Sequence, residues 1–249
     1  MTIKNKKRLL FIDMLRGLAV LNMVIFHLFY DLVYIYGYEF DWFMSRASQI
    51  WQQSIAWTFI LVAGFSFNLT RKYFKHAFTL VLFSTILTLV TYYLMPEEVI
   101  WFGILHFLAT TFIITWLTQN FLQKINPWIG IFLALALFYI TRNIYSGYLN
   151  FFNYNIMIPE AIYTNKYLFW LGFPLDSFSS SDYFPLLPWF FLYIVGFFIG
   201  KLFRLGKISV PKFPKKNNIL TFLGQNSLII YLLHQPIIIG LMTFIKIYK

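Results

Sequence analysis

Long apolar runs separated by short polar segments repeat along the whole chain. An α-helix needs about 20 mainly apolar residues to cross the hydrocarbon core of a bilayer. Seven runs approach or exceed this length: Leu9 to Tyr36, Ser54 to Asn68, Ala77 to Met95, Phe102 to Leu122, Trp128 to Thr141, Pro185 to Leu202 and Ile219 to Ile245. The predicted fold is therefore all-α, a polytopic integral membrane bundle of about seven transmembrane helices.

One further apolar segment leaves the number of spans open. Phe151 to Phe173 is apolar but is interrupted by Pro159, Glu160 and Lys166. A segment of this kind fits either an eighth span or a re-entrant or interfacial stretch. Because apolar runs recur from end to end, no separate soluble domain can be delimited, and we treat residues 1–249 as a single transmembrane domain.

Composition agrees with a membrane protein. Hydrophobic residues make up 59% of the chain and charged residues only 12%, whereas about a quarter of the residues in a soluble domain are charged. The chain has no cysteine. Disulfides, thiol nucleophiles and zinc–thiolate sites are thereby excluded.

The basic residues are divided unevenly between the two sides of the predicted bundle. Fourteen lie on the side of the N-terminus and five on the other side, where all seven acidic residues outside the first span also lie. By the positive-inside rule, the side with fourteen basic residues is cytoplasmic. This topology, with attraction to anionic lipid, accounts for the net charge of +11, and no motif indicates nucleic-acid binding.

The first predicted span carries four ionisable residues, Asp13, Arg16, His27 and Asp31. An ionisable side chain in hydrocarbon is costly, so its presence inside a span marks a candidate site. Arg16 and His27 are eleven residues apart, and eleven steps of about 100° place them within about 20° of the same helix face. Asp13 precedes Arg16 by three residues and Asp31 follows His27 by four, spacings at which helical side chains meet. We therefore expect one polar face along this span.

Each of these residues suggests a role and also has a structural alternative. His27 suits a general base, and Asp31 could orient its imidazole and stabilise the imidazolium. Arg16 could bind a phosphate or another polar ligand that enters from the cytoplasm. In the alternative interpretation, His27 is a buried histidine bonded to a carbonyl group, and Asp13 alone satisfies Arg16.

A second set of polar residues could line the same cavity or could only make helix contacts. His106 lies at the start of the fourth span, and Asn226, Ser227 and His234 lie in the seventh, which Pro236 should kink. Ser227 and His234 are seven residues apart and share a helix face. Because no ligand pair has the spacing of H-E-x-x-H, we expect no metal.

The segment from Asn143 to Ser181 is rich in Tyr, Asn and Ser and is expected on the outer side. A connection of about 40 residues exceeds the usual length and is often functional. It could form a lid or an acceptor-binding surface, or it could simply pack over the bundle.

Five segments of the chain resemble the transmembrane acyltransferase superfamily, and within it the heparan-alpha-glucosaminide N-acetyltransferase-like branch. They occur in the family's order and span nearly the whole chain. The most specific is the first, where Arg16, ten residues and His27 look like the arginine-x10-histidine pattern of the related acyltransferase-3 proteins. The segments are FIDMLRGLAVLNMVIFHLFYDL, TFILVAGFSFNLTRK, WFGILHFLA, DYFPLLPWFFLYIVGFFIGK and LGQNSLIIYLLHQPI.

The resemblance implies transfer of an acyl group, expected to be acetyl, from cytoplasmic acyl-CoA to a hydroxyl or amine of an extracytoplasmic glycan or glycolipid. It implies that His27 is the catalytic histidine, and that Arg16, with Asp13, engages the donor. The lysosomal enzyme that gives the branch its name carries its active histidine in the loop after the first span, whereas Glu39 to Gln53 contains none here. We expect an integral protein of a bacterial or archaeal cell membrane with a cytoplasmic N-terminus.

A second class of function stays open at this point. Buried Arg, Asp and His residues also serve proton-coupled carriers and flippases, here for an envelope precursor. No inverted repeat or matched pair of broken helices is evident in the sequence, which favours the enzyme. Neither the acyl group, the acceptor nor the oligomeric state can be inferred from the sequence.

Overall fold

The computed structural model describes residues 9–247. The chain forms two compact units, which are described separately: the first includes residues up to 62 and from 209 onward, and the second includes residues 63–208. The prediction of a single domain stays a prediction. Five of the basic residues that set the expected orientation lie outside the described residues, namely Lys4, Lys6, Lys7, Arg8 and Lys249.

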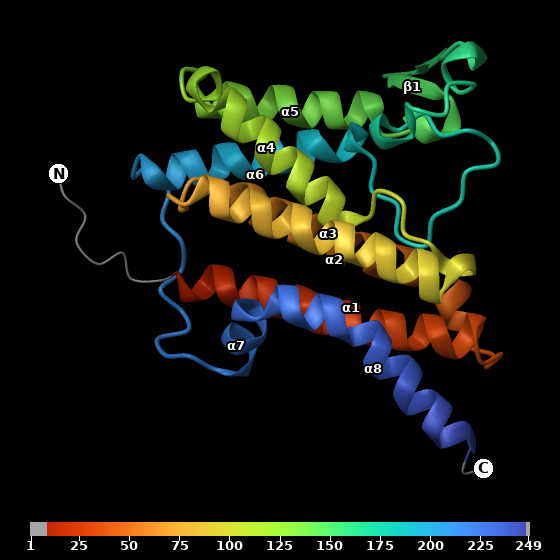
Figure 1. The fold of residues 1–249 in the computed structure, drawn as a ribbon. Helices are drawn as coiled ribbons and strands as arrows, with labels where there is room; N and C mark the ends of the chain where they lie inside the picture. Colours follow the sequence, from red (N-terminus) through yellow and green to blue (C-terminus); the bar gives the residue numbers. More distant parts are fainter. Residues whose placement is uncertain (1–8, 248–249) are drawn as a thin grey trace. The chain divides into compact units, whose positions relative to one another are not determined.

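The first unit contains the helices that carry most of the candidate site. It consists of α1 (Leu10–Tyr34), most of α2 (Arg46–Phe67), the short α7 (Ile219–Gln225) and α8 (Ser227–Ile247). Both α7 and α8 pack on α1, and Figure 1 shows α8 running beside α1. The two ends of the chain thus come together around the first span.

Two glycines allow α1 and α7 to touch backbone to backbone. A Cβ atom on Gly17 would lie 1.8 Å from the carbonyl oxygen of Leu220, and a Cβ atom on Gly224 would lie 1.8 Å from that of Asp13. Any side chain larger than hydrogen would therefore separate the helices, as at other small-residue crossings in membranes. Asn218 caps the start of α7 through a reciprocal pair of hydrogen bonds with Thr221.

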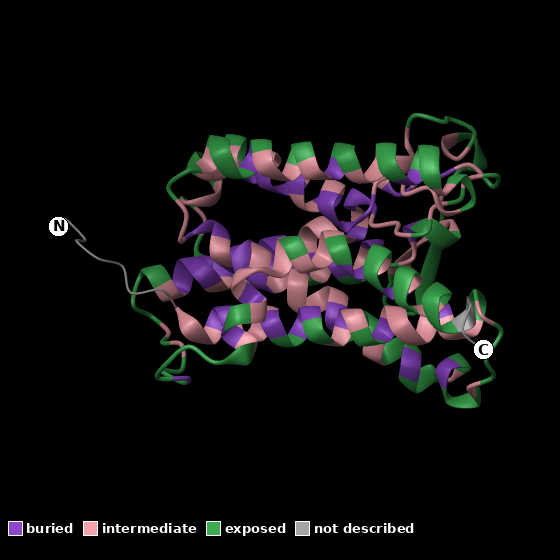
Figure 2. Ribbon diagram, turned by 60° about the horizontal axis from the view of Figure 1, so that its bottom comes forward, coloured by how far each residue is buried: buried purple, intermediate pink, exposed green. Residues whose placement is uncertain are grey.

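The second unit contains α3 (Tyr73–Leu94), α4 (Ile104–Leu122), α5 (Pro127–Thr141) and α6 (Leu186–Arg204). α3 packs on α4, and α5 packs on α6. In its most apolar stretch α6 has 67% of its residues buried, against 22% for α5, and Figure 2 shows how buried and exposed residues alternate around the helices. α6 is thus the central helix of this unit, and α5 presents a broad apolar surface outward.

The predicted helical membrane fold is confirmed, although one long helix, α4, is less apolar than the others. Each of the seven predicted runs contains a helix, and six described helices are long and apolar enough to cross a membrane. α4 has 19 residues but is not among these six, because His106, Gln119 and Asn120 lower its mean hydropathy. The count of seven spans therefore stays a prediction.

The structure decides one alternative about the spans and corrects one expectation. Phe151 to Phe173 is no eighth span, because it contains part of a hairpin and short 3-10 turns in place of a long helix. The hairpin pairs β1 (Tyr148–Phe151) with β2 (Tyr154–Met157) in antiparallel register. The predicted seventh span is broken at Asn226 into α7 and α8. α8 contains Pro236, where the sequence predicts a kink, and Figure 1 shows α8 changing direction along its length.

Lys201 has a structural role that the charge pattern did not indicate. α6 continues past Lys201 to Arg204, and the Lys201 side chain is buried. The Nζ atom donates hydrogen bonds to the carbonyl oxygens of Gln123 (2.8 Å), Ile125 (2.5 Å) and Leu122 (3.4 Å). A cation at this point satisfies the last carbonyl groups of α4 and the turn that leads into α5.

The segment from Asn143 to Ser181 is held in a folded conformation by hydrogen bonds from tyrosine side chains to its backbone. Tyr163 donates its hydroxyl hydrogen to the carbonyl oxygen of Ile144, and Tyr183 donates to that of Phe169. Burial raises the pKa of Tyr183, so the phenol stays neutral and keeps its hydrogen bond at physiological pH. Packing of the segment is therefore evident, while a lid or an acceptor surface stays a prediction.

Candidate active site

Two histidines from opposite ends of the chain meet in the first unit. The ring centroids of His27 on α1 and His234 on α8 are 4.9 Å apart, with the ring planes inclined at 61°. His234 is 7% exposed, and His27 is half-buried. Of the alternatives open for His234, the structure therefore favours a place beside His27.

The hydrogen bonds of His234 define which of its nitrogens carries the proton. Its Nδ1 atom lies 2.6 Å from the carbonyl oxygen of Tyr231. A carbonyl oxygen can only accept, so Nδ1 is the donor, and in the neutral ring Nε2 is the basic nitrogen. His234 is thus held in one tautomer by the preceding turn of its own helix.

A second pair of polar residues joins the same two helices close by. Gln235 Nε2 on α8 donates to Asp31 Oδ1 on α1 over 3.3 Å. Asp31 is fully buried and follows His27 by one helical turn, while Gln235 follows His234 directly. This hydrogen bond joins Asp31 to Gln235. The predicted role of Asp31 in orienting the His27 imidazole stays a prediction.

The other predicted pair lies nearer the start of α1. Arg16 Nη1 contacts Asp13 Oδ1 at 3.3 Å, and Gln225 Nε2 of α7 donates to Asp13 Oδ2 over 3.4 Å. The Asp13 side chain is 6% exposed, whereas that of Arg16 is 23% exposed. Asp13 thus connects α1 to α7, and Arg16 keeps part of its guanidinium accessible.

Two of the predicted cavity residues lie at the break between α7 and α8. Asn226 is the residue at the break, and its Nδ2 atom donates to the carbonyl oxygen of Phe222 (2.8 Å). Ser227 begins α8. No described contact brings either of them to the histidine pair, so Asn226 stabilises the helix break, and a ligand-binding role for Asn226 and Ser227 stays a prediction.

His106 belongs to the second unit. Its Nε2 atom lies 3.0 Å from Thr88 Oγ1, and its ring stacks on that of Phe102 with 6.1 Å between centroids. Phe102 has φ of 56°, a conformation that aromatic residues rarely adopt. Asp182 Oδ2 accepts a hydrogen bond from the backbone N–H of Ile104 and so caps the start of α4 beside His106. A substrate-binding role for His106 stays a prediction.

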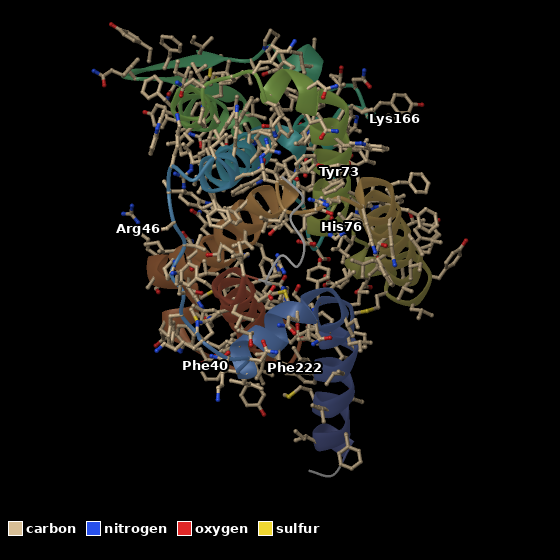
Figure 3. All side chains as sticks on the ribbon, turned by 90° about the vertical axis from the view of Figure 1, so that its left-hand side faces the viewer. Phe40, Arg46, Tyr73, His76, Lys166 and Phe222 are labelled. Atoms are coloured by element: carbon tan, nitrogen blue, oxygen red, sulfur yellow. The ribbon has the colours of Figure 1, made fainter. Side chains whose placement is uncertain are left out.

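The fourth histidine, His76, has no described contact with His27, His234 or His106. His76, labelled with Tyr73 on α3 in Figure 3, is exposed, and its ring stacks on Phe112 with 5.6 Å between centroids. It serves below as a matched control for His27.

Two glutamines, Gln235 and Gln225, were not among the predicted site residues. Each is a glutamine that donates to one of the two carboxylates of α1. The signal that could have found Gln235 is its position, because a polar amide inside an apolar span needs a polar partner or a polar cavity.

The candidate site has the chemistry of proton transfer and nucleophilic attack. Histidine is a base near neutral pH and can also be a nucleophile. Two adjacent rings can exchange a proton, and the amide and carboxylate of the neighbouring pair can orient a polar ligand. Among the described residues, no group of three or more His, Cys, Asp or Glu side chains is placed to hold a metal ion.

Comparison with known proteins gives one match. The sequence model of the family described as "Heparan-alpha-glucosaminide N-acetyltransferase, catalytic" matches residues 8–236. The matched range includes every candidate residue above, from Asp13 to Gln235. No curated protein and no solved structure matches the chain.

Proposed function

The chain belongs to the heparan-alpha-glucosaminide N-acetyltransferase catalytic family, and from this premise we propose that it moves an acyl group from acyl-CoA across the membrane. The acyl group is expected to be acetyl. The donor binds from the cytoplasm, and the acceptor is a hydroxyl or amine of an extracytoplasmic glycan or glycolipid. The family and the apolar helices make the protein an integral membrane protein of the N-acetyltransferase type; the donor, the acceptor and the sidedness are the proposal.

The observation that carries the proposal is the contact between His27 and His234. A histidine inside a membrane span is energetically costly and is therefore found mainly where it has a function. Here two histidines come together from positions 207 residues apart. Both lie within the region that matches the family. This arrangement supports His27 as the catalytic residue and His234 as the group that receives or returns its proton.

The atoms of the reaction balance in either of two routes. In the direct route, His27 takes the proton of the acceptor O–H or N–H while the oxygen or nitrogen attacks the thioester carbon. The C–S bond breaks, and the leaving CoA thiolate takes up a proton from the histidine pair. In the covalent route, His27 itself attacks the thioester carbon, the C–S bond breaks, and the CoA thiolate takes up the proton that the His27 ring loses. The acceptor oxygen or nitrogen then attacks the acyl-imidazole, and its proton passes to the imidazole as the C–N bond breaks.

Arg16 and Asp13 are proposed to engage the donor. The exposed part of the Arg16 guanidinium can bind a phosphate of CoA, while Asp13 holds the rest of the side chain. The helical rise from Arg16 to His27 is about 16 Å. Pantetheine is a long arm, so the phosphates can stay at the cytoplasmic mouth while the thioester reaches the histidine pair.

A direct test uses the purified protein with acetyl-CoA as donor and glucosamine as a probe acceptor. Release of free CoA and formation of an acetylated sugar are expected, with both lost in His27→Ala and both retained in His76→Ala. A proton-coupled carrier would produce neither. Wild-type rates in His27→Ala would exclude His27 from the mechanism.

A further inference from the structure

Gln235 presents a buried acceptor atom to the candidate site. Its Nε2 atom donates to Asp31, while its Oε1 atom is buried and accepts no hydrogen bond from any described residue. A buried polar atom left in this condition costs about 1–3 kcal/mol. Such an atom in a native structure calls for an explanation.

Asp31 determines which way the amide of Gln235 faces. An ionised carboxylate can only accept hydrogen bonds, so it must face the NH₂ group and not the oxygen of the amide. This argument assigns the two amide atoms by chemistry. The fully buried Asp31 thus holds the Nε2 side of the amide, which leaves Oε1 to accept from another group.

The acceptor atom lies at the junction of α1 and α8 that also holds the two histidines. Gln235 follows His234 directly, and Asp31 is one helical turn beyond His27. The hydrogen bond to Asp31 places the Gln235 amide one helical turn beyond His27 along α1, within the length of a ligand that binds at the His27 ring. The N–H or O–H group of such a ligand would satisfy Oε1.

We propose that Gln235 is a substrate-positioning residue whose Oε1 atom accepts a hydrogen bond from an N–H or O–H group of the substrate, with Asp31 fixing its orientation. The inference rests on the proposed function. Two substrate groups share this chemistry, namely the nucleophilic amine or hydroxyl of the acceptor and an amide N–H of the pantetheine arm of the donor.

The test compares Gln235→Met with Gln52→Met, which makes the same change at an exposed glutamine of α2. The KM for glucosamine is measured at saturating acetyl-CoA, and the Kd of acetyl-CoA is measured by calorimetry. Loss of one hydrogen bond should raise one of these constants about three- to tenfold in Gln235→Met. Gln52→Met should change neither.

The two sources of the hydrogen bond give different results. A raised KM for glucosamine with unchanged acetyl-CoA binding identifies the acceptor, and weakened acetyl-CoA binding with an unchanged KM identifies the donor. If both constants are unchanged, or if only kcat falls, the proposal is wrong while the acyltransferase function stands. A wild-type protein that neither binds acetyl-CoA nor transfers its acyl group would overturn the proposed function, and this inference with it.

Asp31→Asn keeps the test decisive if Gln235→Met fails to fold. An asparagine can donate as well as accept, so it no longer fixes which amide atom of Gln235 faces the substrate. The same constant should rise in this variant. Binding and kinetics identical to those of the wild type would contradict the orienting role of Asp31.

A separate observation concerns the β1–β2 hairpin of the second unit. Large apolar residues of the hairpin are unusually exposed: Phe151 49%, Phe152 85%, Tyr154 76%, Ile156 51% and Met157 72%. Contiguous apolar surface of this kind marks an interaction site. Phe152 also has φ of 52° at the first position of the two-residue turn, where glycine or asparagine is favoured. A phenylalanine in this strained backbone conformation indicates that the aromatic side chain itself has a function.

Two hydrogen bonds fix the depth of the hairpin relative to α5. Asn150 Nδ2 donates to the carbonyl oxygen of Tyr139 (3.0 Å), and Asn143 Nδ2 donates to Asn150 Oδ1 (2.9 Å). Tyr139 lies within the last turn of α5, inside an apolar stretch that continues to Ser146. Figure 1 shows the hairpin beside this end of α5.

We also infer that the tip of this hairpin, residues 151–157, lies in the lipid interface at the C-terminal end of α5. An aromatic tip suits the headgroup region, whereas the exposed strand edges would be unstable deeper in the hydrocarbon. The hairpin would then anchor the long segment to the membrane surface.

Spin labels on single cysteines test this inference, since the natural chain has none. The labels are placed by Phe152→Cys, by Phe132→Cys on the exposed face of α5, and by Lys166→Cys at an exposed residue that is labelled in Figure 3. In lipid vesicles, collision with oxygen should be most frequent for the label at 132, intermediate at 152 and least frequent at 166. Collision with a water-soluble nickel chelate should be most frequent at 166, intermediate at 152 and least frequent at 132. Collision with nickel equal to that at 166 would place the tip in water. Protection from both reagents would show that a protein surface covers it.

Discussion

His27 and His234 lie with their rings 4.9 Å apart, although 207 residues separate them in the sequence. The contact joins the first span to the last and places an imidazole of fixed tautomer beside His27, the residue proposed as catalytic. Asp31 and Gln235 repeat the connection between the same two helices. The candidate chemistry is therefore built on helices, which hold side chains more firmly than loops do.

The first prediction separates the two ends of the polar face of α1. Arg16→Ala removes the guanidinium group that is proposed to bind a CoA phosphate. The change should weaken acetyl-CoA binding about tenfold or more, because a hydrogen bond between charged groups contributes about 1.5–3 kcal/mol. His27→Ala should leave binding nearly unchanged and abolish transfer. Calorimetry with acetyl-CoA and the release of free CoA measure the two effects. A His27→Ala protein that loses donor binding as fully as Arg16→Ala would contradict this division of roles.

The second prediction concerns His234 itself. His234→Phe keeps a ring of similar size next to His27 but removes both nitrogens, so packing should survive while turnover falls. Groups that transfer protons contribute about 10²–10⁴ in rate. The drop in kcat should therefore be at least about 10², with acetyl-CoA binding unchanged. A variant with wild-type kcat would leave His234 a packing residue only.

The helices and the polar face of α1 could be predicted from the sequence because each depends on local pattern. Apolar length identifies a span, and an eleven-residue spacing identifies a face, whatever the rest of the chain does. The pairing of His234 with His27 could not be derived in this way, because it depends on which helices pack together. For the same reason Gln235 escaped notice, since its partner Asp31 lies on another helix.

The errors have a similar physical origin. The strands of the hairpin have only four residues each, too few for an alternating pattern to stand out from an apolar segment. The role of Lys201 could not be predicted, because its three carbonyl partners come from a distant turn of the chain. The packing of α7 against α1 at Gly17 and Gly224, next to the helix break at Asn226, is a contact between distant parts of the chain and has no local sequence pattern.

The third prediction tests that close contact. Gly17→Ala or Gly224→Ala would place a methyl group 1.8 Å from a carbonyl oxygen of the facing helix, so the helices must move apart. Overpacking of this kind costs about 1–3 kcal/mol, which should appear as a lower unfolding temperature in detergent. Gly240→Ala in α8 is the matched control, because a Cβ there meets nothing within 4 Å. Equal unfolding temperatures for all three variants would contradict the contact.

The fourth prediction concerns Lys201. Lys201→Met keeps the apolar stem but removes the ammonium group from three carbonyl groups. These carbonyls end α4 and lead into α5, and their loss of a charged donor should cost about 2–3 kcal/mol of stability. The expected result is a lower unfolding temperature with acetyl-CoA binding intact. Lys207→Met, at an exposed position shortly after α6, should change neither.

The fifth prediction concerns sidedness. Cysteines at Ser146 and Ser209, both exposed, are expected on opposite sides of the membrane because of the distribution of basic residues. An impermeant thiol reagent applied to intact cells should label the first and not the second. Labelling of Ser209→Cys alone would reverse the proposed topology, and with it the assignment of Arg16 to the cytoplasmic mouth.

The same reagent decides whether α4 crosses the membrane. α4 has the length of a span but is not among the six helices that are apolar enough. Cysteines at Glu97, before α4, and Asn120, in its last turn, are both exposed in the structure. If α4 crosses as the seven-span topology requires, Glu97→Cys is labelled in intact cells, and Asn120→Cys is labelled only after the cells are opened. Labelling of both in intact cells would leave α4 on the outer surface and reduce the spans to six.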